Sequence, residues 1–267
     1  MTDREGTPVD GQITSERVGR VLAIGIDRPT KLNGFSPKML VELAEAFTGL
    51  ERDEEVWVGV LFAHGPNFTA GLELDKVAPI MRERGTVFPD GAVDPLSLRP
   101  PIRTKPLVCA VQGICFTLGI ELMLAADIVV AAHDCRFAQI EIARGIMPVG
   151  GATVRLVERA GWGNAQRYLL TADEFGSSEA LRLGLVQEVV PAGREKARAM
   201  EIAGVIAQQA PLAVRASLAS SRSAVDHGPH AAIREFNAQQ ARLMATEDAA
   251  EGVRSFIERR HGRFIGR

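Results

Sequence analysis

The sequence has few of the features that mark a secreted or metal-binding protein. It contains three cysteines, at positions 109, 115 and 135, and no two of them are spaced as Cys-x-x-Cys. This spacing suggests neither a zinc site nor a disulfide framework, so we expect buried, reduced thiols in a cytoplasmic protein. The first ten residues are acidic and polar and lack the apolar segment of a signal peptide, so we expect a disordered tail there.

The sequence also lacks an excess of either charge and a long uninterrupted apolar run. The formal net charge is −2 and no basic stripe is present, which argues against nucleic acid as a partner. The longest apolar stretch, from Pro106 to Ala132, is interrupted by two glycines and two acidic residues, which argues against a membrane span. The five histidines show no convincing ligand spacing, and we expect no metal.

Strand-like and helix-like segments alternate over residues 1–190, and this alternation predicts an α/β core. β-rich runs between Gly11 and Asp27 indicate two paired strands. A helix is expected after Ser36, because a proline follows it and apolar residues recur at helical spacing. The other strands that we expect lie at residues 56–63, 107–111 and 128–132.

Two further segments of this core have less regular patterns. Residues 113–117 are expected to lead into a helix that ends near Ala126. The polar, proline-rich stretch from Lys76 to Pro106 has little periodicity and is long for a loop in a compact domain. We therefore expect this stretch to be functional or mobile.

Residues 191–267 have a different pattern, in which helical segments follow one another without a strand. We expect helices at residues 194–208, 211–225, 229–245 and 247–260. Helices with apolar faces at a chain end often pack on another subunit. The sequence thus predicts a core over residues 1–190 and a helical C-terminal region over residues 191–267.

Two acidic residues, Glu121 and Asp127, stand inside the longest apolar stretch. Asp127 lies at a helix-to-strand junction, where a turn or cap role accounts for it. Glu121 lies within a helix between two large apolar residues. Although it could be a core glutamate paired with a basic residue, desolvated ionisable groups cluster at functional sites, so we favour a functional role.

The backbone N–H of Leu118 lies one helical turn before Glu121 and on the same face. A free N–H beside a carboxylate is typical of an oxyanion site next to an acid/base group. Glu141 is less distinctive. It ends residues 137–141, which could begin a short helix, and its own surroundings favour a solvated surface role.

Five ordered sequence blocks resemble the enoyl-CoA hydratase/isomerase, or crotonase, family over nearly all of residues 18–264. The blocks are Arg28-Pro29-Thr30-Lys31-Leu32-Asn33, Phe68-Thr69-Ala70-Gly71-Leu72-Glu73, residues 106–127, residues 137–151, and Gly184-Leu185-Val186 with residues 256–260. The resemblance implies a crotonase-like spiral of ββα units with an α-helical C-terminal trimerisation region. It also implies a homotrimer or a hexamer made of two trimers.

The resemblance further implies an acyl-CoA thioester substrate, no cofactor apart from the coenzyme A of the substrate, and hydration of a 2-enoyl-CoA to a 3-hydroxyacyl-CoA. The oxyanion hole would be the backbone N–H groups of Leu72 and Leu118. Glu121 is assigned as the base-like partner and Glu141 as the acid, because two nearby carboxyls resist double ionisation and take opposite roles. The residues expected to line the substrate and CoA channel are Lys31, Leu32, Ala70 and Gly71.

The loop before the first glutamate departs from the glycine-rich form that is usual in this family. Only the last residue of Thr117-Leu118-Gly119 is a glycine. The loop keeps its backbone N–H groups without the other glycines, but the side chain of Leu118 must be accommodated. Two alternatives therefore stay open: an isomerase or other crotonase activity on an unusual acyl-CoA, and a homologue that binds acyl-CoA without turnover. Retention of both glutamates favours the hydratase.

Overall fold

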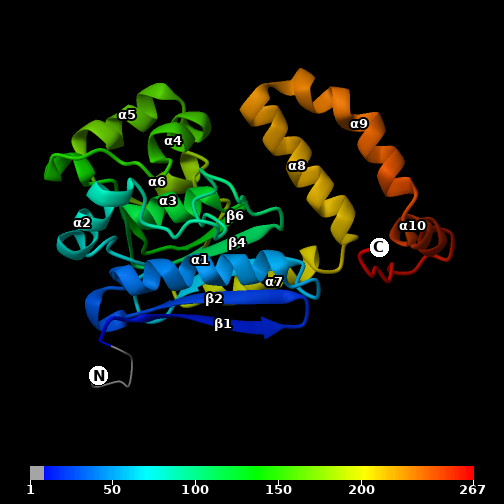
Figure 1. Ribbon diagram of the computed structural model, residues 1–267, viewed down its shortest axis with the longest axis horizontal. Coiled ribbons are helices and arrows are strands. Elements are labelled where there is room, and N and C mark those ends of the chain that lie inside the picture. The colour runs from blue at the N-terminus through cyan, green and yellow to red at the C-terminus, as the bar shows by residue number, and fades with distance from the viewer. Residues whose placement is uncertain (1–8) are drawn as a thin grey trace.

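A computed structural model describes residues 9–267 of the chain (Figure 1). The main sheet has six strands in the order β1-β2-β3-β4-β6-β9, of which β1 and β2 are antiparallel and the other neighbours parallel. Its strands are β1 (Gln12–Val18), β2 (Val21–Asp27), β3 (Val58–Ala63), β4 (Leu107–Val111), β6 (Ile128–Ala132) and β9 (Glu188–Val190). A second sheet has the order β5-β7-β8, with strands β5 (Ile114–Phe116), β7 (Arg136–Ala138) and β8 (Phe175–Gly176).

Helices surround the two sheets and then continue beyond them. The first group is η1 (Pro29–Lys31), α1 (Pro37–Arg52), α2 (Leu74–Arg84), α3 (Leu118–Ala125), η2 (Glu141–Arg144), α4 (Ala152–Ala160), α5 (Trp162–Thr171) and α6 (Ser177–Arg182). The last four are α7 (Glu195–Ile206), α8 (Pro211–His227), α9 (Pro229–Met244) and α10 (Glu247–Ile257). Strands that lead in pairs into helices form the crotonase-like α/β fold that the resemblance implies.

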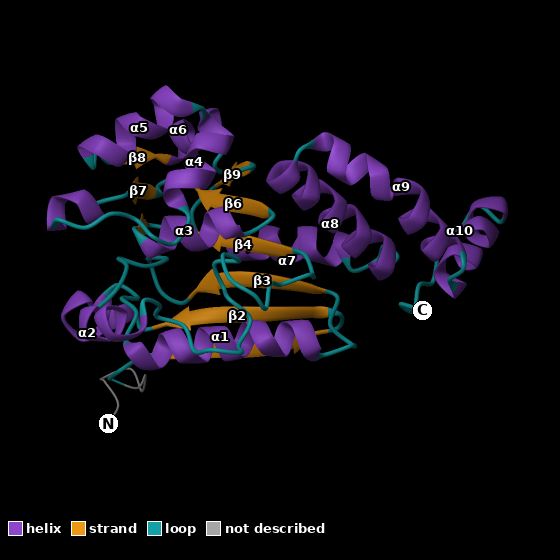
Figure 2. Cartoon of the chain, turned by 45° about the horizontal axis from the view of Figure 1, so that its top comes forward, coloured by secondary structure: helices purple, strands orange, loops and turns teal. Residues whose placement is uncertain are grey.

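The main sheet is covered on both faces, as Figure 2 shows. Alternate residues of a strand point to opposite faces. On β3, Leu61 and Ala63 therefore join the larger core, which contains the apolar faces of α1 and α3, whereas Val58, Val60 and Phe62 pack with α7. Parallel strands buried on both faces are expected to be continuously apolar, as β3 is.

The start of α1 and the first described residues are held together by side-chain hydrogen bonds. Ser36 caps α1, because its Oγ accepts the N–H of Met39 at 3.3 Å, and its hydroxyl donates to the Asp10 carbonyl at 2.6 Å. Arg28 Nε donates to the Val9 carbonyl at 3.0 Å. Residues 1–8 of the tail that we expect at the N-terminus lie outside the described residues, and the chain is attached to the core from Val9 onward.

The expectation of a continuous loop over residues 76–106 is wrong for its first part, because α2 extends to Arg84. Pro79 lies inside this helix and removes one intrahelical N–H donor. Among the residues of α2 only Val77 is buried, so the helix lies mostly at the surface. Residues 85–106 have neither helix nor strand, as expected.

Two short strands were not expected from the sequence. Residues 113–117 lead into α3, as expected, but they also contain β5, and residues 137–141, which could have begun a short helix, start inside β7. The short helix η2 begins only at Glu141. β5 and β7 pair with each other, and strands of three residues are too short to show a period in the sequence.

Helices α8, α9 and α10 project from the core, and Figures 1 and 2 both show them on the side away from α2. α7, by contrast, packs on the main sheet. One link from α8 to the core is Arg222, which donates to the Arg103 carbonyl at 2.6 Å and to Asp127 Oδ1 at 2.9 Å. Asp127 also accepts the N–H of Leu107, the first residue of β4, at 2.7 Å, and it forms ion pairs with Arg103 and Arg222. Its carboxylate therefore joins distant segments and does not cap a helix or a turn.

The three cysteines are buried and unbridged, as expected. No helix within residues 9–267 has the length and apolarity needed to cross a membrane.

Candidate active site

Glu121 lies in the first turn of α3, a helix whose eight residues are all buried. Only 5% of its surface is exposed, and its carboxylate lines a small cavity. A buried carboxylate needs hydrogen-bond donors, and two backbone N–H groups provide them. Glu121 Oε1 accepts from Gly150 at 2.6 Å and from Ala152 at 3.4 Å, while Oε2 has no hydrogen-bond partner within residues 9–267.

Gly150 makes the close approach of this carboxylate possible. A Cβ atom added to Gly150 would collide with the carboxylate of Glu121, whose oxygens would then have to move. Its φ is not positive, so the backbone alone does not require glycine here. The sequence block that contains Gly150-Gly151 thus has a physical role in fixing Glu121, and the sequence did not indicate this contact.

Burial raises the pKa of Glu121 to about 7, and the negative charge of Glu141 contributes in the same direction. The N–H groups of Gly150 and Ala152 and the positive charge of Arg155 oppose that rise. The carboxyl therefore changes its protonation state near neutral pH, as a general acid or base must.

Glu141 begins η2 and is half-buried. Gln139 Nε2 donates to its Oε1 at 2.9 Å, whereas Oε2 is buried and has no hydrogen-bond partner within the described chain. Burial raises the pKa of Glu141, and the hydrogen bonds from its own backbone and from Gln139 lower it less. The negative charge of Glu141 acts on Glu121, but Glu141 is not among the residues that line the cavity with Glu121.

The backbone N–H groups of Leu72 and Leu118 are both available at this site. Both residues line the cavity with Glu121, and neither N–H has a hydrogen-bond partner among residues 9–267. Phe35 binds the residues on each side of Leu72, since Phe35 N–H donates to Gly71 O at 2.8 Å and Glu73 N–H donates to Phe35 O at 2.9 Å. In an extended segment the N–H of Leu72 then points away from Phe35.

Thr117, which precedes Leu118, has a backbone conformation that glycine favours. Its φ is 50° and its ψ is −114°, which is rare for a β-branched residue and costs about 1–3 kcal/mol. Its N–H donates to the Ala138 carbonyl at 3.0 Å. A Cβ atom on Gly71 would collide with the hydroxyl of Thr117, so the two segments that carry the free N–H groups are in contact. The Thr-Leu-Gly loop thus keeps a glycine-like backbone.

The residues expected to line the CoA channel lie next to these donors along the chain. Lys31 ends η1 and Leu32, which follows it, is 44% exposed. The Ala70 N–H donates to the Leu32 carbonyl at 2.9 Å, which joins the two sequence blocks. Contact of Lys31, Leu32, Ala70 and Gly71 with coenzyme A stays a prediction.

The cavity has a volume of about 60 Å³ and a wall that sequence reasoning did not identify. That wall comes from the end of α2 and the segment after it. Its residues include Met81, Val87, Phe88, Asp94, Leu96, Leu98 and Arg99. The available signal was the length of the 76–106 stretch, which suggested function but named no residue.

The chain is similar to known proteins along nearly its whole length. Residues 16–267 match the family model described as enoyl-CoA hydratase/isomerase. An enoyl-CoA hydratase of Mycobacterium tuberculosis is 31% identical over 94% of this chain and 96% of its own length. The 2,3-dehydroadipyl-CoA hydratase of Escherichia coli is 30% identical over 96% of this chain and 99% of its own length.

Solved structures agree with these relatives. A probable enoyl-CoA hydratase/isomerase from Mycobacterium abscessus is 46% identical, with a TM-score of 0.92 over 96% of this chain and 98% of its own. An enoyl-CoA hydratase from Mycobacterium tuberculosis is 33% identical, with a TM-score of 0.86 over 96% of this chain and 99% of its own.

Proposed function

The chain belongs to the enoyl-CoA hydratase/isomerase family, and we propose that it is a hydro-lyase that adds water to a 2-enoyl-CoA, giving a 3-hydroxyacyl-CoA. One observation carries this proposal: Glu121, whose pKa is raised by burial and by the charge of Glu141, lines a cavity with two backbone N–H groups that have no partner within the part of the chain that the structure describes. Several relatives of similar length are named as enoyl-CoA hydratases.

The N–H groups of Leu72 and Leu118 bind the thioester carbonyl oxygen. Two donors on this oxygen draw electron density from the conjugated double bond, so that C3 becomes electrophilic and the enolate-like state is stabilised. Loss of one donor from such a hole costs about 3–4 kcal/mol. The strained conformation of Thr117 orients one of these two donors.

The two glutamates divide the proton transfers. Glu121 takes a proton from water through Oε2, the oxygen without a partner among residues 9–267, while the water oxygen bonds to C3. Glu141 gives its proton to C2, so that water has been added in full. The cycle closes when the proton on Glu121 is lost and Glu141 regains one. Backbone donors on Glu121 Oε1 favour its charged form, which suits the base.

The alternatives fit the site less well. The family resemblance associates isomerases with one of the two glutamates, and this chain has both. A homologue that binds acyl-CoA without turnover would have no use for a carboxyl whose pKa lies near 7 at the cavity.

A panel of 2-enoyl-CoA thioesters tests the reaction. We expect the purified protein to bleach the absorbance of the conjugated thioester and to release a 3-hydroxyacyl-CoA that mass spectrometry identifies. Transfer of the double bond without a gain of water would indicate an isomerase. Binding without any turnover across the panel would support the non-catalytic alternative.

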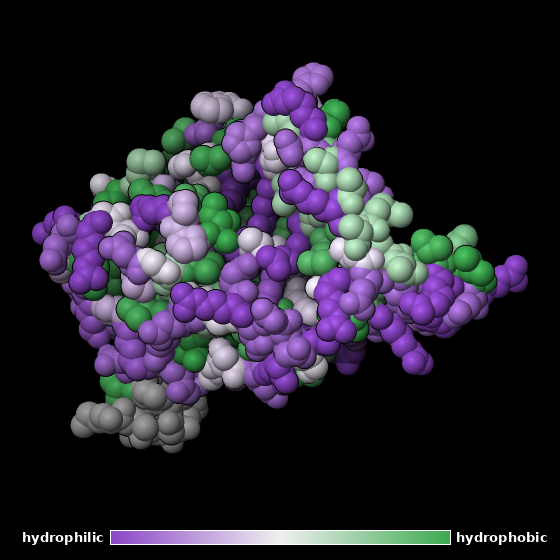
Figure 3. Space-filling model, turned by 45° about the vertical axis from the view of Figure 1, so that its right-hand side comes forward, coloured by the Kyte–Doolittle hydropathy of each residue, from purple (hydrophilic) through white to green (hydrophobic). Residues whose placement is uncertain are grey.

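We also propose that the protein is a homotrimer or a hexamer of two trimers. Its C-terminal helices carry exposed apolar side chains, and Figure 3 shows apolar residues along the projecting part of the molecule. They include Val225, Ile233, Phe236, Met244, Val253, Phe256 and Ile257. Exposed apolar surface of this kind is typical of subunit contacts. Native mass spectrometry tests the assembly, and a monomer would contradict it.

The cytoplasm is the compartment that we propose, because three buried, unbridged cysteines suit a reducing environment. Fractionation of cells that express a tagged chain tests this assignment.

A further inference from the structure

Part of the cavity wall is segment 94–99, which has neither helix nor strand. Asp94, Leu96, Leu98 and Arg99 of this segment line the cavity together with Glu121. Leu96 is only 6% exposed, so the segment has an inner face although it lies at the surface. Loops that line a site are often mobile, so the contacts that hold this segment in place determine the position of the wall.

Asp94 organises the N–H groups of the segment. Its Oδ1 accepts the N–H of Leu96 at 2.9 Å, and its Oδ2 accepts those of Leu98 at 3.1 Å and Arg99 at 3.0 Å. The Asp94 carbonyl also accepts the N–H of Ser97 at 2.9 Å. The N–H groups of residues 96–99 are thereby satisfied by Asp94, while the carbonyls of Leu96 and Ser97 need donors from outside the segment.

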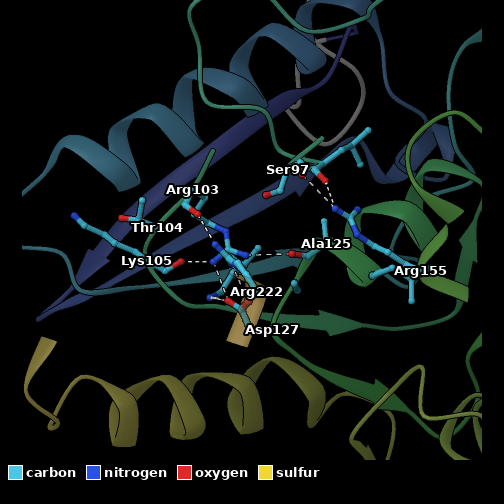
Figure 4. Close-up of polar contacts among 12 residues, drawn as sticks. Ser97, Arg103, Thr104, Lys105, Ala125, Asp127, Arg155 and Arg222 are labelled. Carbon is cyan, nitrogen blue, oxygen red and sulfur yellow. Dashed lines mark hydrogen bonds and ion pairs between the residues drawn. The ribbon is translucent and has the colours of Figure 1, made fainter. Parts of the chain in front are cut away.

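Arg155 of α4 supplies that donor. Its Nη2 lies 2.7 Å from the Leu96 carbonyl oxygen and 3.4 Å from that of Ser97, and Figure 4 shows the side chain reaching from α4 to Ser97. These two carbonyl oxygens accept no other hydrogen bond from residues 9–267. The segment has two other polar contacts outside itself, from the Asp94 N–H to the Pro101 carbonyl at 3.0 Å and from Arg99 Nη2 to the Gly85 carbonyl at 3.3 Å. Arg155 makes the shortest of these contacts, and charged donors make stronger hydrogen bonds than neutral ones.

The same helix also holds the reacting carboxylate. The N–H of Ala152, at the start of α4, donates to Glu121, and Arg155 lies one turn further along the helix. Gly151 leaves room for this arrangement, since a Cβ atom there would lie 2.9 Å from Arg155 Nη1 and 3.3 Å from Leu98 Cδ2. α4 therefore sets the position of the wall relative to the catalytic centre.

The side chains on this side of the cavity are apolar and bulky. With the thioester carbonyl at Leu72 and Leu118 and C3 beside Glu121, an acyl tail would extend along the same lining. The side chains of Phe88, Leu96 and Leu98, which also line the cavity, would meet a longer tail.

We propose that Arg155 is a positioning residue that fixes segment 94–99 as the end wall of the acyl pocket, and that this wall restricts the enzyme to short 2-enoyl chains. The inference rests on the proposed hydration reaction. Arg155 acts on the acyl pocket through the backbone of the segment and not by contact with the reacting atoms. Its positive charge also lowers the pKa of Glu121, but that effect is common to all chain lengths and leaves their ratio unchanged.

The test compares kcat/KM for substrates from crotonyl-CoA to 2-decenoyl-CoA. The kcat/KM of the wild-type enzyme is expected to fall as the acyl chain lengthens. The fall should be about tenfold or more for each lengthening that the pocket does not accommodate. Arg155→Met keeps much of the volume of the side chain but leaves the two carbonyls without a donor. It is expected to raise the ratio of kcat/KM for 2-decenoyl-CoA over crotonyl-CoA by about tenfold or more. Arg155→Lys, which retains a donor, is expected to restore part of the wild-type ratio.

Arg159→Met is the matched control. Arg159 lies on the same helix and also donates to two backbone carbonyls, those of Leu124 at 2.8 Å and Ala126 at 3.3 Å, which are not in segment 94–99. Its loss is expected to lower stability without changing the chain-length ratio. A wild type that hydrates long and short chains equally, or an Arg155→Met variant that loses all chain lengths by one factor, would overturn the inference. If wild type hydrates no substrate, the proposed function itself fails and the inference falls with it.

Discussion

The two glutamates of the active site are held by different kinds of structure. Glu121 belongs to a fully buried helix, and one of its oxygens accepts two backbone N–H groups. Glu141 begins a short 3-10 helix, is half-buried, and has one side-chain partner within the described residues, Gln139. Both pKa values are raised by burial, but only that of Glu121 is raised to about 7 with a contribution from its neighbour's charge.

The difference shows how one site obtains two proton-transfer groups from the same residue type. The backbone N–H groups at Glu121 can only donate hydrogen bonds, so they stabilise its charged carboxylate. Both bind Oε1 and leave Oε2 to accept a proton. Glu141 has a buried oxygen without a partner in residues 9–267, which favours its protonated form. Burial raises both pKa values, so the assignment of Glu121 as the base rests on the backbone donors at its Oε1 and on the family resemblance.

Glu121→Gln is expected to have the largest effect. The amide keeps the shape of the side chain but cannot take a proton from water, so kcat on crotonyl-CoA should fall by about 10⁴-fold. A steady-state assay of thioester bleaching measures this, with circular dichroism to check the fold. A variant with near wild-type kcat would show that Glu121 is not the base.

Glu141→Gln is expected to cost less, about 10²- to 10³-fold in kcat, because water reaches a half-buried position more easily and replaces part of its role. This variant also tests the coupling between the carboxyls. The wild-type rate should fall as the pH drops through about 7, where Glu121 becomes protonated and can no longer act as a base.

The amide introduced by Glu141→Gln is neutral, so the pKa of Glu121 should fall and the acid limb of the pH–rate profile should move to lower pH. An acid limb that stays in place in this variant would mean that the two carboxyls are not coupled. A limb that moves to higher pH would contradict the assigned sign.

Gly150→Ala is expected to have the smallest effect of the three, about 10²-fold in kcat, because the added methyl group displaces the Glu121 carboxylate without removing it. Gly163→Ala is the control. Gly163 has open space around its Cα and no positive φ, so the activity of this variant should match wild type. If Gly150→Ala is as active as wild type, the backbone cradle does not position Glu121.

Much of the fold follows from local patterns. The paired strands between Gly11 and Asp27, the helix capped by Ser36, and the helical C-terminal region all appear where periodicity and caps predict them. Among the elements that were missed, α2 contains a proline, which argues against a helix, and β5 and β7 are three residues long, too short to show a period. β5 and β7 obtain their conformation by pairing with each other.

The amino-acid sequence alone was enough to predict the α/β class, the apolar setting of Glu121 and, through ordered family blocks, the pairing of Glu121 with Glu141. Three-dimensional packing was needed to establish that the N–H of Gly150 holds Glu121 and that Thr117 adopts the backbone of a glycine. The same holds for the reach of Arg155 to segment 94–99. These contacts join residues far apart along the chain, and local periodicity carries no information about which distant backbone groups will meet.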